Sequence, residues 1–167
     1  MAALRDLLPA AGADPSEVVD AFGAWAEATG RPLYAHQEDA ILALAMGDHV
    51  VLATPTGSGK SLVAMAGIAL ALNAGRRAVW TAPIKALVAE KFFDLVDLLG
   101  ADTVGLATGD ASINPDAPVL VCTAEVLANH ALAVGPASEF GFACLDEFHY
   151  YAEPVSYTHL RAHETEA

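Results

Sequence analysis

The order of apolar and polar segments predicts an α/β fold, a mainly parallel β-sheet flanked by helices. Short, continuous apolar runs recur between residues 49 and 145, as expected for strands that are buried on both faces. Helical patterns separate these runs, and such strand–helix–strand alternation is typical of a parallel sheet. Hydrophobic residues make up 54% of the 167 residues and charged residues 17%, a composition that excludes intrinsic disorder.

Five segments are predicted to be helices, and a glycine follows most of them. The first begins at Asp14-Pro15, a capping residue followed by a proline suited to the first helical turn, and it stops at Gly30. The glycines at positions 47, 75 and 100 end the next three helices. The predicted helices cover residues 14–30, 36–46, 59–74, 84–99 and 124–134.

Five apolar runs are predicted to be strands, at residues 49–53, 78–81, 103–107, 119–122 and 142–145. A polar, proline-containing loop is expected at residues 108–118. Ligands of parallel sheets bind beyond the carboxyl ends of the strands. The polar motifs of this chain follow the strand ends, so we expect the functional residues to gather along one edge of the sheet.

Charge and cysteine content narrow the functional class. The net charge of −13 argues against a bulk electrostatic nucleic-acid binder, but it leaves room for a local contact strip. Cys122 and Cys144 are too few for a disulfide framework and lack the spacing of a zinc module. The N-terminus lacks a signal-peptide pattern, and the apolar stretch at residues 62–72 is shorter than the ~20 residues that span a bilayer. We therefore expect a cytoplasmic protein without a membrane span.

A glycine-rich turn that follows the first predicted strand and opens a helix has the pattern of a phosphate-binding P-loop. It reads Thr54-Pro55-Thr56-Gly57-Ser58-Gly59-Lys60-Ser61. Gly57 and Gly59 allow the backbone to curl so that N–H groups face phosphate oxygens, and the helix adds its positive dipole end. In such a loop Lys60 reaches the β- and γ-phosphates of ATP, and the Ser61 hydroxyl holds Mg²⁺. A chance glycine–serine turn is the alternative, which the flanking strand and helix disfavour.

Two adjacent carboxylates, Asp146 and Glu147, end the last predicted strand. Like charges at a buried strand end repel each other and are poorly solvated, and a bound Mg²⁺ removes much of that penalty. In a P-loop enzyme Asp146 would hold Mg²⁺ through water, and Glu147 would polarise the water that attacks the γ-phosphate. Ordinary solvated acids at a strand end are the alternative interpretation.

With His149, these motifs resemble those of superfamily 2 helicases with a DExH box, in particular the Ski-type RNA and DNA helicases, over roughly residues 33–153. The resemblance implies an incomplete RecA-like P-loop domain that uses ATP and Mg²⁺. Thr54, in place of the first glycine of the general motif, is typical of this superfamily. The resemblance gives His149 a coupling role next to the catalytic acids Asp146 and Glu147. It also places Tyr34 and Gln37 in the motif that reads adenine, although Gln37 could equally be a surface helix residue.

The same resemblance assigns three further strand ends to a single nucleic-acid strand. The implied contact residues are Pro83, Lys85, Gly109, Asp110, Thr123 and Glu125. Lys85 would meet a phosphate, helped by the N-terminus of its helix. Each short motif alone could be a turn or a helix cap, and their order after the P-loop is what supports the assignment.

The C-terminal segment does not resemble the rest of the chain. Residues 155–165 match the translation of a transposase-based sequencing-library adapter. We therefore expect an N-terminal helical lead-in at 1–32, a truncated first RecA-like domain at 33–153 and a non-native tail at 154–167. The resemblance implies a second RecA-like domain in the parent protein, which supplies an arginine finger, and a further strand in the middle of the sheet.

Three functions remain open for the parent protein. The leading one is an ATP-dependent helicase, of which this chain alone would be aggregation-prone and nearly inactive. A double-strand translocase or remodelling motor without unwinding shares every motif. A non-catalytic nucleotide-binding module is disfavoured because Lys60, Asp146 and Glu147 are all intact.

Overall fold

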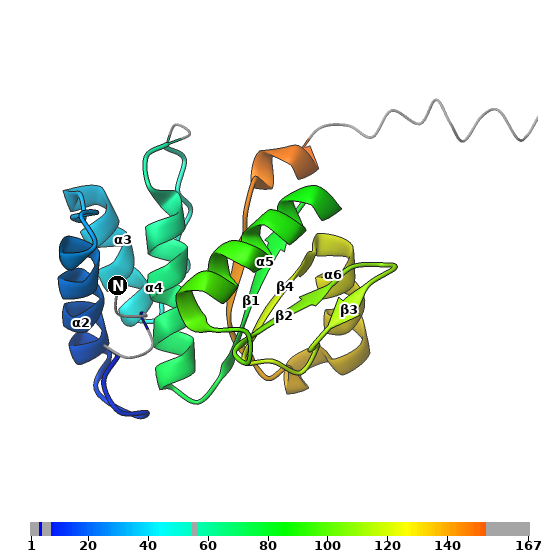
Figure 1. Ribbon diagram of the computed structural model, residues 1–167, viewed down its shortest axis with the longest axis horizontal. Coiled ribbons are helices and arrows are strands. Elements are labelled where there is room, and N and C mark those ends of the chain that lie inside the picture. The colour runs from blue at the N-terminus through cyan, green and yellow to red at the C-terminus, as the bar shows by residue number, and fades with distance from the viewer. Residues whose placement is uncertain (1–3, 5–7, 55–56, 153–167) are drawn as a thin grey trace, which may run out of the picture.

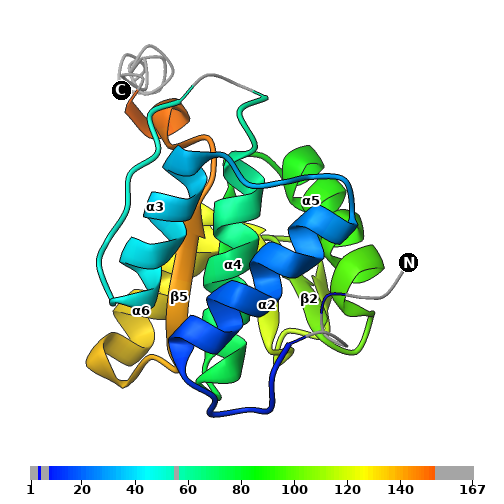
Figure 2. The same ribbon diagram turned by 90° about the vertical axis from the view of Figure 1, so that its left-hand side faces the viewer.

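A computed structural model describes residue 4, residues 8–54 and residues 57–152 of the chain. The segment predicted to be a non-native tail lies outside these ranges, as do Pro55 and Thr56 of the glycine-rich turn. The described residues form a five-stranded sheet with helices on both faces (Figures 1 and 2), and the predicted α/β class is confirmed.

The strands lie in the order β3-β2-β4-β1-β5. Their bounds are β1 Arg77–Ala82, β2 Val104–Ala107, β3 Ser112–Ile113, β4 Val119–Thr123 and β5 Phe140–Leu145. All neighbouring pairs are parallel except β2 and β3, which are antiparallel. The short strand β3 lies inside the segment that was predicted to be a loop. Its two residues are exposed, so no apolar pattern marks them, and only pairing with β2 makes them a strand.

The helices are α2 Pro15–Ala28, α3 Ala35–Ala45, α4 Lys60–Asn73, α5 Lys85–Leu99 and α6 Ala124–Val134, with a short 3₁₀ helix η2 at Phe148–Ala152. These bounds agree closely with the predicted ones. Helices α4 and α5 cover one face of the sheet and α6 lies against the other, while α2 and α3 pack outside α4 (Figure 2). Alternate strand residues therefore enter two cores, Trp80 on the side of α4 and α5 and Val79 on the side of α6.

The predicted strand at residues 49–53 is wrong: the structure shows no strand there. The Val51 side chain is 90% exposed, although the apolar run had predicted burial on both faces. A strand exists only when a neighbour accepts and donates its backbone hydrogen bonds, and among the described residues none pairs with this segment. Figure 2 shows the segment that follows α3 running up to the glycine-rich turn outside the sheet.

Candidate functional site

The glycine-rich turn has the backbone geometry of an anion-binding loop in its described part. Gly57 and Gly59 have φ angles of 85° and 76°, in the left-handed region that favours glycine. Gly59 directly precedes α4, so the unpaired N–H groups of the first helical turn face the loop. The Lys60 Nζ donates to the carbonyl oxygen of Thr54 at 2.7 Å, and the hydroxyls of Thr54 and Ser58 lie 2.6 Å apart. The Lys60 side chain thus reaches from the first turn of α4 back to Thr54, the first residue of the loop.

Gln37 lies beneath this loop and is only 1% exposed. Its Nε2 donates to the carbonyl oxygens of Ser58 and Gly59 at 2.9 and 3.1 Å, and its Oε1 accepts from the Tyr34 backbone N–H at 2.9 Å. The side chain therefore ties the start of α3 to the loop, a contact that the sequence did not predict. It is no surface helix residue, and its reading of adenine stays a prediction. The exposed Tyr34 ring stacks on His36 with a centroid distance of 5.9 Å.

The acid pair follows β5 directly. The Asp146 backbone N–H donates to the Thr81 carbonyl at 3.0 Å, which extends the β1–β5 ladder past the strand end. One Asp146 oxygen accepts from the Glu147 backbone N–H at 2.9 Å, and the other accepts from the Trp80 indole N–H at 3.3 Å. Glu147 has a φ of 50°, a conformation that side chains rarely adopt and that concentrates at functional sites. His149 Nδ1 lies 3.3 Å from Glu147 Oε2, so the predicted coupling residue does contact the acid pair.

The glycine-rich turn and the acid pair lie at the same end of the sheet. Helix α4 packs on β5 where a Cβ built on Gly67 would lie 2.4 Å from the Phe142 ring. Lys60 precedes that contact by seven residues of helix and Asp146 follows it by four residues of extended chain. Because α4 and β5 run in opposite directions, going back along the helix and forward along the strand leads to the same end of the sheet. The two distances are about 10 Å along the helix and about 13 Å along the strand. Both views show α4 beginning where β5 ends (Figures 1 and 2).

The donor set at this end suits Mg²⁺ bound together with a nucleotide. Ser61 and Asp146 offer the hard oxygen ligands that Mg²⁺ prefers, and this ion usually takes only one or two protein ligands beside phosphates and water. Within the described ranges no cluster of three or more His, Cys, Asp or Glu side chains could hold a metal by itself.

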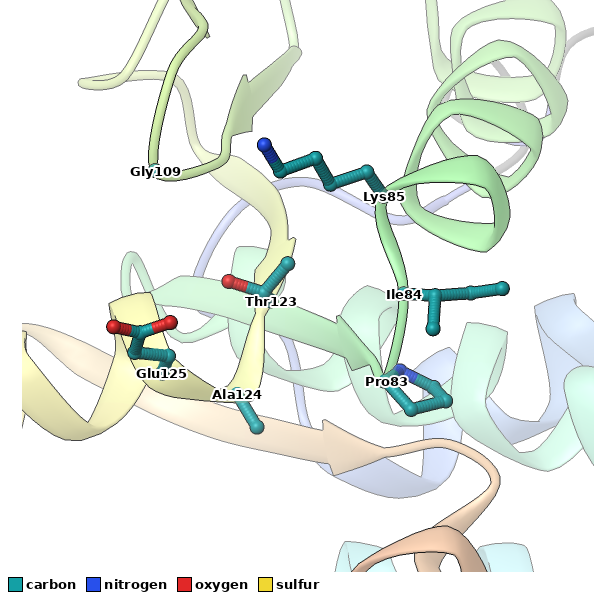
Figure 3. Close-up of a pocket in the computed structure, with 7 residues that line it drawn as sticks. All are labelled: Pro83, Ile84, Lys85, Gly109, Thr123, Ala124 and Glu125. Carbon is teal, nitrogen blue, oxygen red and sulfur yellow. The ribbon is translucent and has the colours of Figure 1, made fainter. Parts of the chain in front are cut away.

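A hollow at the same end of the sheet collects the residues predicted to contact nucleic acid. Its volume is about 530 Å³, and its lining residues are Pro83, Ile84, Lys85, Gly109, Thr123, Ala124 and Glu125 (Figure 3). Five of the six predicted contact residues line it. The sixth, Asp110, lies 2.7 Å from Lys85 Nζ. In the described structure neither α5 nor α6 has a side-chain cap at its N-terminus, and both helices begin at this hollow.

The ion pair between Lys85 and Asp110 shapes the electrostatics of the hollow. The Lys85 hydrogen bond, followed by that of the Thr108 hydroxyl, lowers the pKa of Asp110 below its ordinary value. Both charged side chains are more than half exposed, so solvent screens the pair. Figure 3 shows the Lys85 side chain extending toward the loop that carries Gly109.

The sequence did not single out Trp80, whereas the hollow-lining residues Ile84 and Ala124 each lie between two predicted contact residues in the chain. Trp80 offered one signal, because a buried tryptophan in a strand needs a partner for its indole N–H. The sequence did not indicate which group that partner was, since Asp146 lies 66 residues away.

Comparison with known proteins identifies the family. Residues 34–165 match the DEAD/DEAH box helicase family. The chain is 42% identical over 118 residues to "Probable helicase HelY" of Mycobacterium tuberculosis, covering 70% of this chain and 13% of that protein. It is 40% identical over 124 residues to "DExH-box ATP-dependent RNA helicase DExH15 chloroplastic" of Arabidopsis thaliana, covering 70% of this chain and 11% of that one.

Two further matches agree with these. The "Antiviral helicase SKI2" of Saccharomyces cerevisiae is 37% identical over 115 residues, which cover 68% of this chain and 9% of that protein. A solved structure of the helicase MrfA bound to DNA and AMPPNP is similar in fold, with a TM-score of 0.60 at 24% identity over 81% of this chain and 21% of that chain. The chain belongs to the DEAD/DEAH box helicase family, and the resemblance to DExH-box and Ski-type members is confirmed. It spans only about a tenth of the length of these curated relatives.

No helix in the described part of the chain is long and apolar enough to cross a membrane.

Proposed function

We propose that this chain is the ATP-binding part of an ATP-dependent nucleic-acid helicase that acts in the cytoplasm. The observation that carries the proposal is the common position of the glycine-rich turn and the acid pair, at the end of the sheet where α4 begins and β5 ends. Family membership supports the same assignment.

The site residues divide the work on Mg²⁺ and ATP. The Ser61 hydroxyl and, through water, the Asp146 carboxylate would hold Mg²⁺, and the bound ion would neutralise charge on the terminal phosphates. Lys60 leaves the Thr54 carbonyl, 2.7 Å away, and meets the β- and γ-phosphates instead. Glu147 orients the attacking water and accepts its proton, and His149, whose Nδ1 lies 3.3 Å from Glu147 Oε2, takes the coupling role next to it.

In this proposal a single nucleic-acid strand binds in the hollow whose lining residues Figure 3 shows. Lys85 supplies the positive charge, and the N-termini of α5 and α6 supply N–H donors for phosphate oxygens. The remaining lining residues position the strand beside β1 and β4. Because the whole chain carries a charge of −13, binding depends on this local strip and not on the overall field.

We also propose the domain division at 1–32, 33–153 and 154–167, with a second RecA-like domain in the parent protein. Two features support a missing strand within the first domain. Strand β5 forms an open edge of the described sheet, and no described residue pairs with the apolar segment at residues 49–53. A strand between them would satisfy both sets of backbone groups. The chain alone is then expected to bind nucleotide with little turnover, since an arginine finger contributes about 10³–10⁵ in rate.

Two lysine substitutions test the two binding sites in the 167-residue chain. Lys60→Ala should weaken binding of a fluorescent ATP analogue about ten- to a hundredfold, as expected for losing a charged hydrogen bond, and leave oligonucleotide binding intact. Lys85→Ala should weaken binding of a single-stranded oligonucleotide and leave binding of the ATP analogue intact. It should also reduce the slope of the logarithm of the oligonucleotide binding constant against the logarithm of salt concentration by about 0.7. Each variant serves as the control for the other. Equal nucleotide affinities of wild type and Lys60→Ala would refute the proposal.

The alternative functions separate in the longer parent protein. Glu147→Gln should abolish ATP hydrolysis while nucleotide binding persists. If the wild-type parent protein is as inactive in ATP hydrolysis as Glu147→Gln, the chain belongs instead to a non-catalytic binding module. Hydrolysis coupled to translocation without displacement of a strand would indicate a translocase.

A further inference from the structure

The side chain beneath the acid pair is Trp80, in the neighbouring strand. Strands β1 and β5 are parallel, with Trp80 in register with Cys144. Asp146 lies two residues beyond Cys144, so its side chain leaves the same face of the sheet as Trp80. Such diagonal neighbours are about 7–8 Å apart at their Cα atoms, a gap that a long side chain spans. The indole Nε1 accordingly reaches Asp146 Oδ2 at 3.3 Å.

Trp80 is held firmly in this position. Trp80 is 1% exposed and belongs to the main core. Lys91, on α5, places its Nζ 5.1 Å from the centroid of the Trp80 ring. A buried indole N–H is costly without an acceptor, so the contact with Asp146 also satisfies Trp80 itself. The ring therefore cannot turn its N–H elsewhere without leaving the core.

The two oxygens of Asp146 each receive one donor. The Trp80 indole binds Oδ2, and the Glu147 backbone N–H binds Oδ1 at 2.9 Å. Rotation of a carboxylate about its last torsion is otherwise loosely restricted, so two donors on opposite oxygens fix its plane. Each oxygen keeps further lone pairs for another ligand.

We propose that Trp80 is a positioning residue that orients the Asp146 carboxylate toward the magnesium nucleotide. This inference rests on the proposed function and names a residue outside the phosphate loop and the acid pair. Hydrogen-bond partners of metal-binding carboxylates fix their orientation, and removing one typically lowers metal affinity or activity about 10- to 100-fold. The contact also links Asp146 to the strand that leads directly into Lys85 at the start of α5.

Trp80→Phe tests this role, because it removes the N–H and keeps an aromatic ring. The readout is the Mg²⁺ concentration that half-saturates binding of a fluorescent ADP analogue to the 167-residue chain. We expect Trp80→Phe to require about tenfold more Mg²⁺, the lower end of the range for such partners. Binding measured in EDTA should be unchanged, because Trp80 is 1% exposed and its indole N–H faces Asp146 and not the phosphate loop.

Trp25→Phe is the matched control. Trp25 is also 1% exposed and also has a cation over its ring, Arg31 at 4.9 Å, but its N–H has no hydrogen-bond partner among the described residues. It lies on α2, so this substitution should leave the Mg²⁺ requirement at the wild-type value. An unchanged requirement in Trp80→Phe, or an equal shift in both variants, would overturn the positioning role.

Failure of the proposed function is a separate result, since wild type would then show no Mg²⁺-dependent nucleotide binding. If Trp80→Phe does not fold by circular dichroism, the Trp25→Phe protein decides the question, because Trp80 is then the only tryptophan of the chain. Its emission should change when Mg²⁺ is added to the ADP-bound protein. Unchanged emission in a protein that does bind the magnesium nucleotide would contradict the contact.

Discussion

Replacing Gly59 by alanine tests the contact between Gln37 and the phosphate loop. Gly59 has a φ of 76°, where a non-glycine residue loses about 1–2 kcal/mol. A Cβ there would also lie 2.3 Å from Gln37 Nε2, so the amide must move away and give up its hydrogen bonds to the Ser58 and Gly59 carbonyls, a loss of about 1–3 kcal/mol for the two. We therefore expect Gly59→Ala to lower the free energy of unfolding by about 2–5 kcal/mol, combining these two effects.

Gly57→Ala provides the matched comparison in the same loop. Its φ is 85°, but an added Cβ would meet nothing within 4 Å among the described residues. We expect this variant to lose only the conformational part, about 1–2 kcal/mol. Urea unfolding followed by circular dichroism measures both variants.

A double-mutant cycle with Gln37→Ala completes the test. Once the amide is removed, Gly59→Ala should cost about as much as Gly57→Ala, because only the left-handed backbone remains unfavourable. Equal losses in the two single variants would refute the reasoning. So would a Gly59→Ala loss that persists unchanged in the Gln37→Ala background.

Two further predictions concern titratable groups. Lys85→Ala should raise the pKa of Asp110 toward its ordinary value, because the Lys85 hydrogen bond is the largest cause of the lowered pKa. In the wild type the Lys85–Asp110 pair contributes to stability above about pH 4, and this contribution fades as the pH falls through the lowered pKa of Asp110. A ¹³C titration of the Asp110 carboxyl carbon in both proteins checks this. Identical titrations in the wild type and in Lys85→Ala would contradict it. Burial raises the pKa of the Cys144 thiol to about 12. At pH 8 the native chain should therefore react with iodoacetamide far more slowly at Cys144 than the urea-unfolded chain, as peptide mass spectrometry can measure, and equal rates would show that the thiol is accessible.

Local patterns in the sequence predicted most of the elements and the candidate site. The helix bounds follow from caps and glycines within a few residues of each end, so the five helices lie where expected. The motif order along a parallel sheet placed the polar residues at one edge, and five of the six predicted nucleic-acid contacts line one hollow. The strand prediction for residues 49–53 was wrong because an apolar run indicates burial between two partner strands, and the described sheet supplies no partner strand for it.

The sequence by itself determined the class of protein, because the phosphate loop, the acid pair and the alternation of strands and helices are all local patterns. Only the tertiary structure decided which side chains support that site. Gln37 meets the loop across 21 residues of sequence and Trp80 meets Asp146 across 66. Such contacts depend on strand register and helix packing, which no stretch of the chain encodes alone. For the same reason the pairing of a strand, unlike the capping of a helix, could be known only when its neighbours were in place.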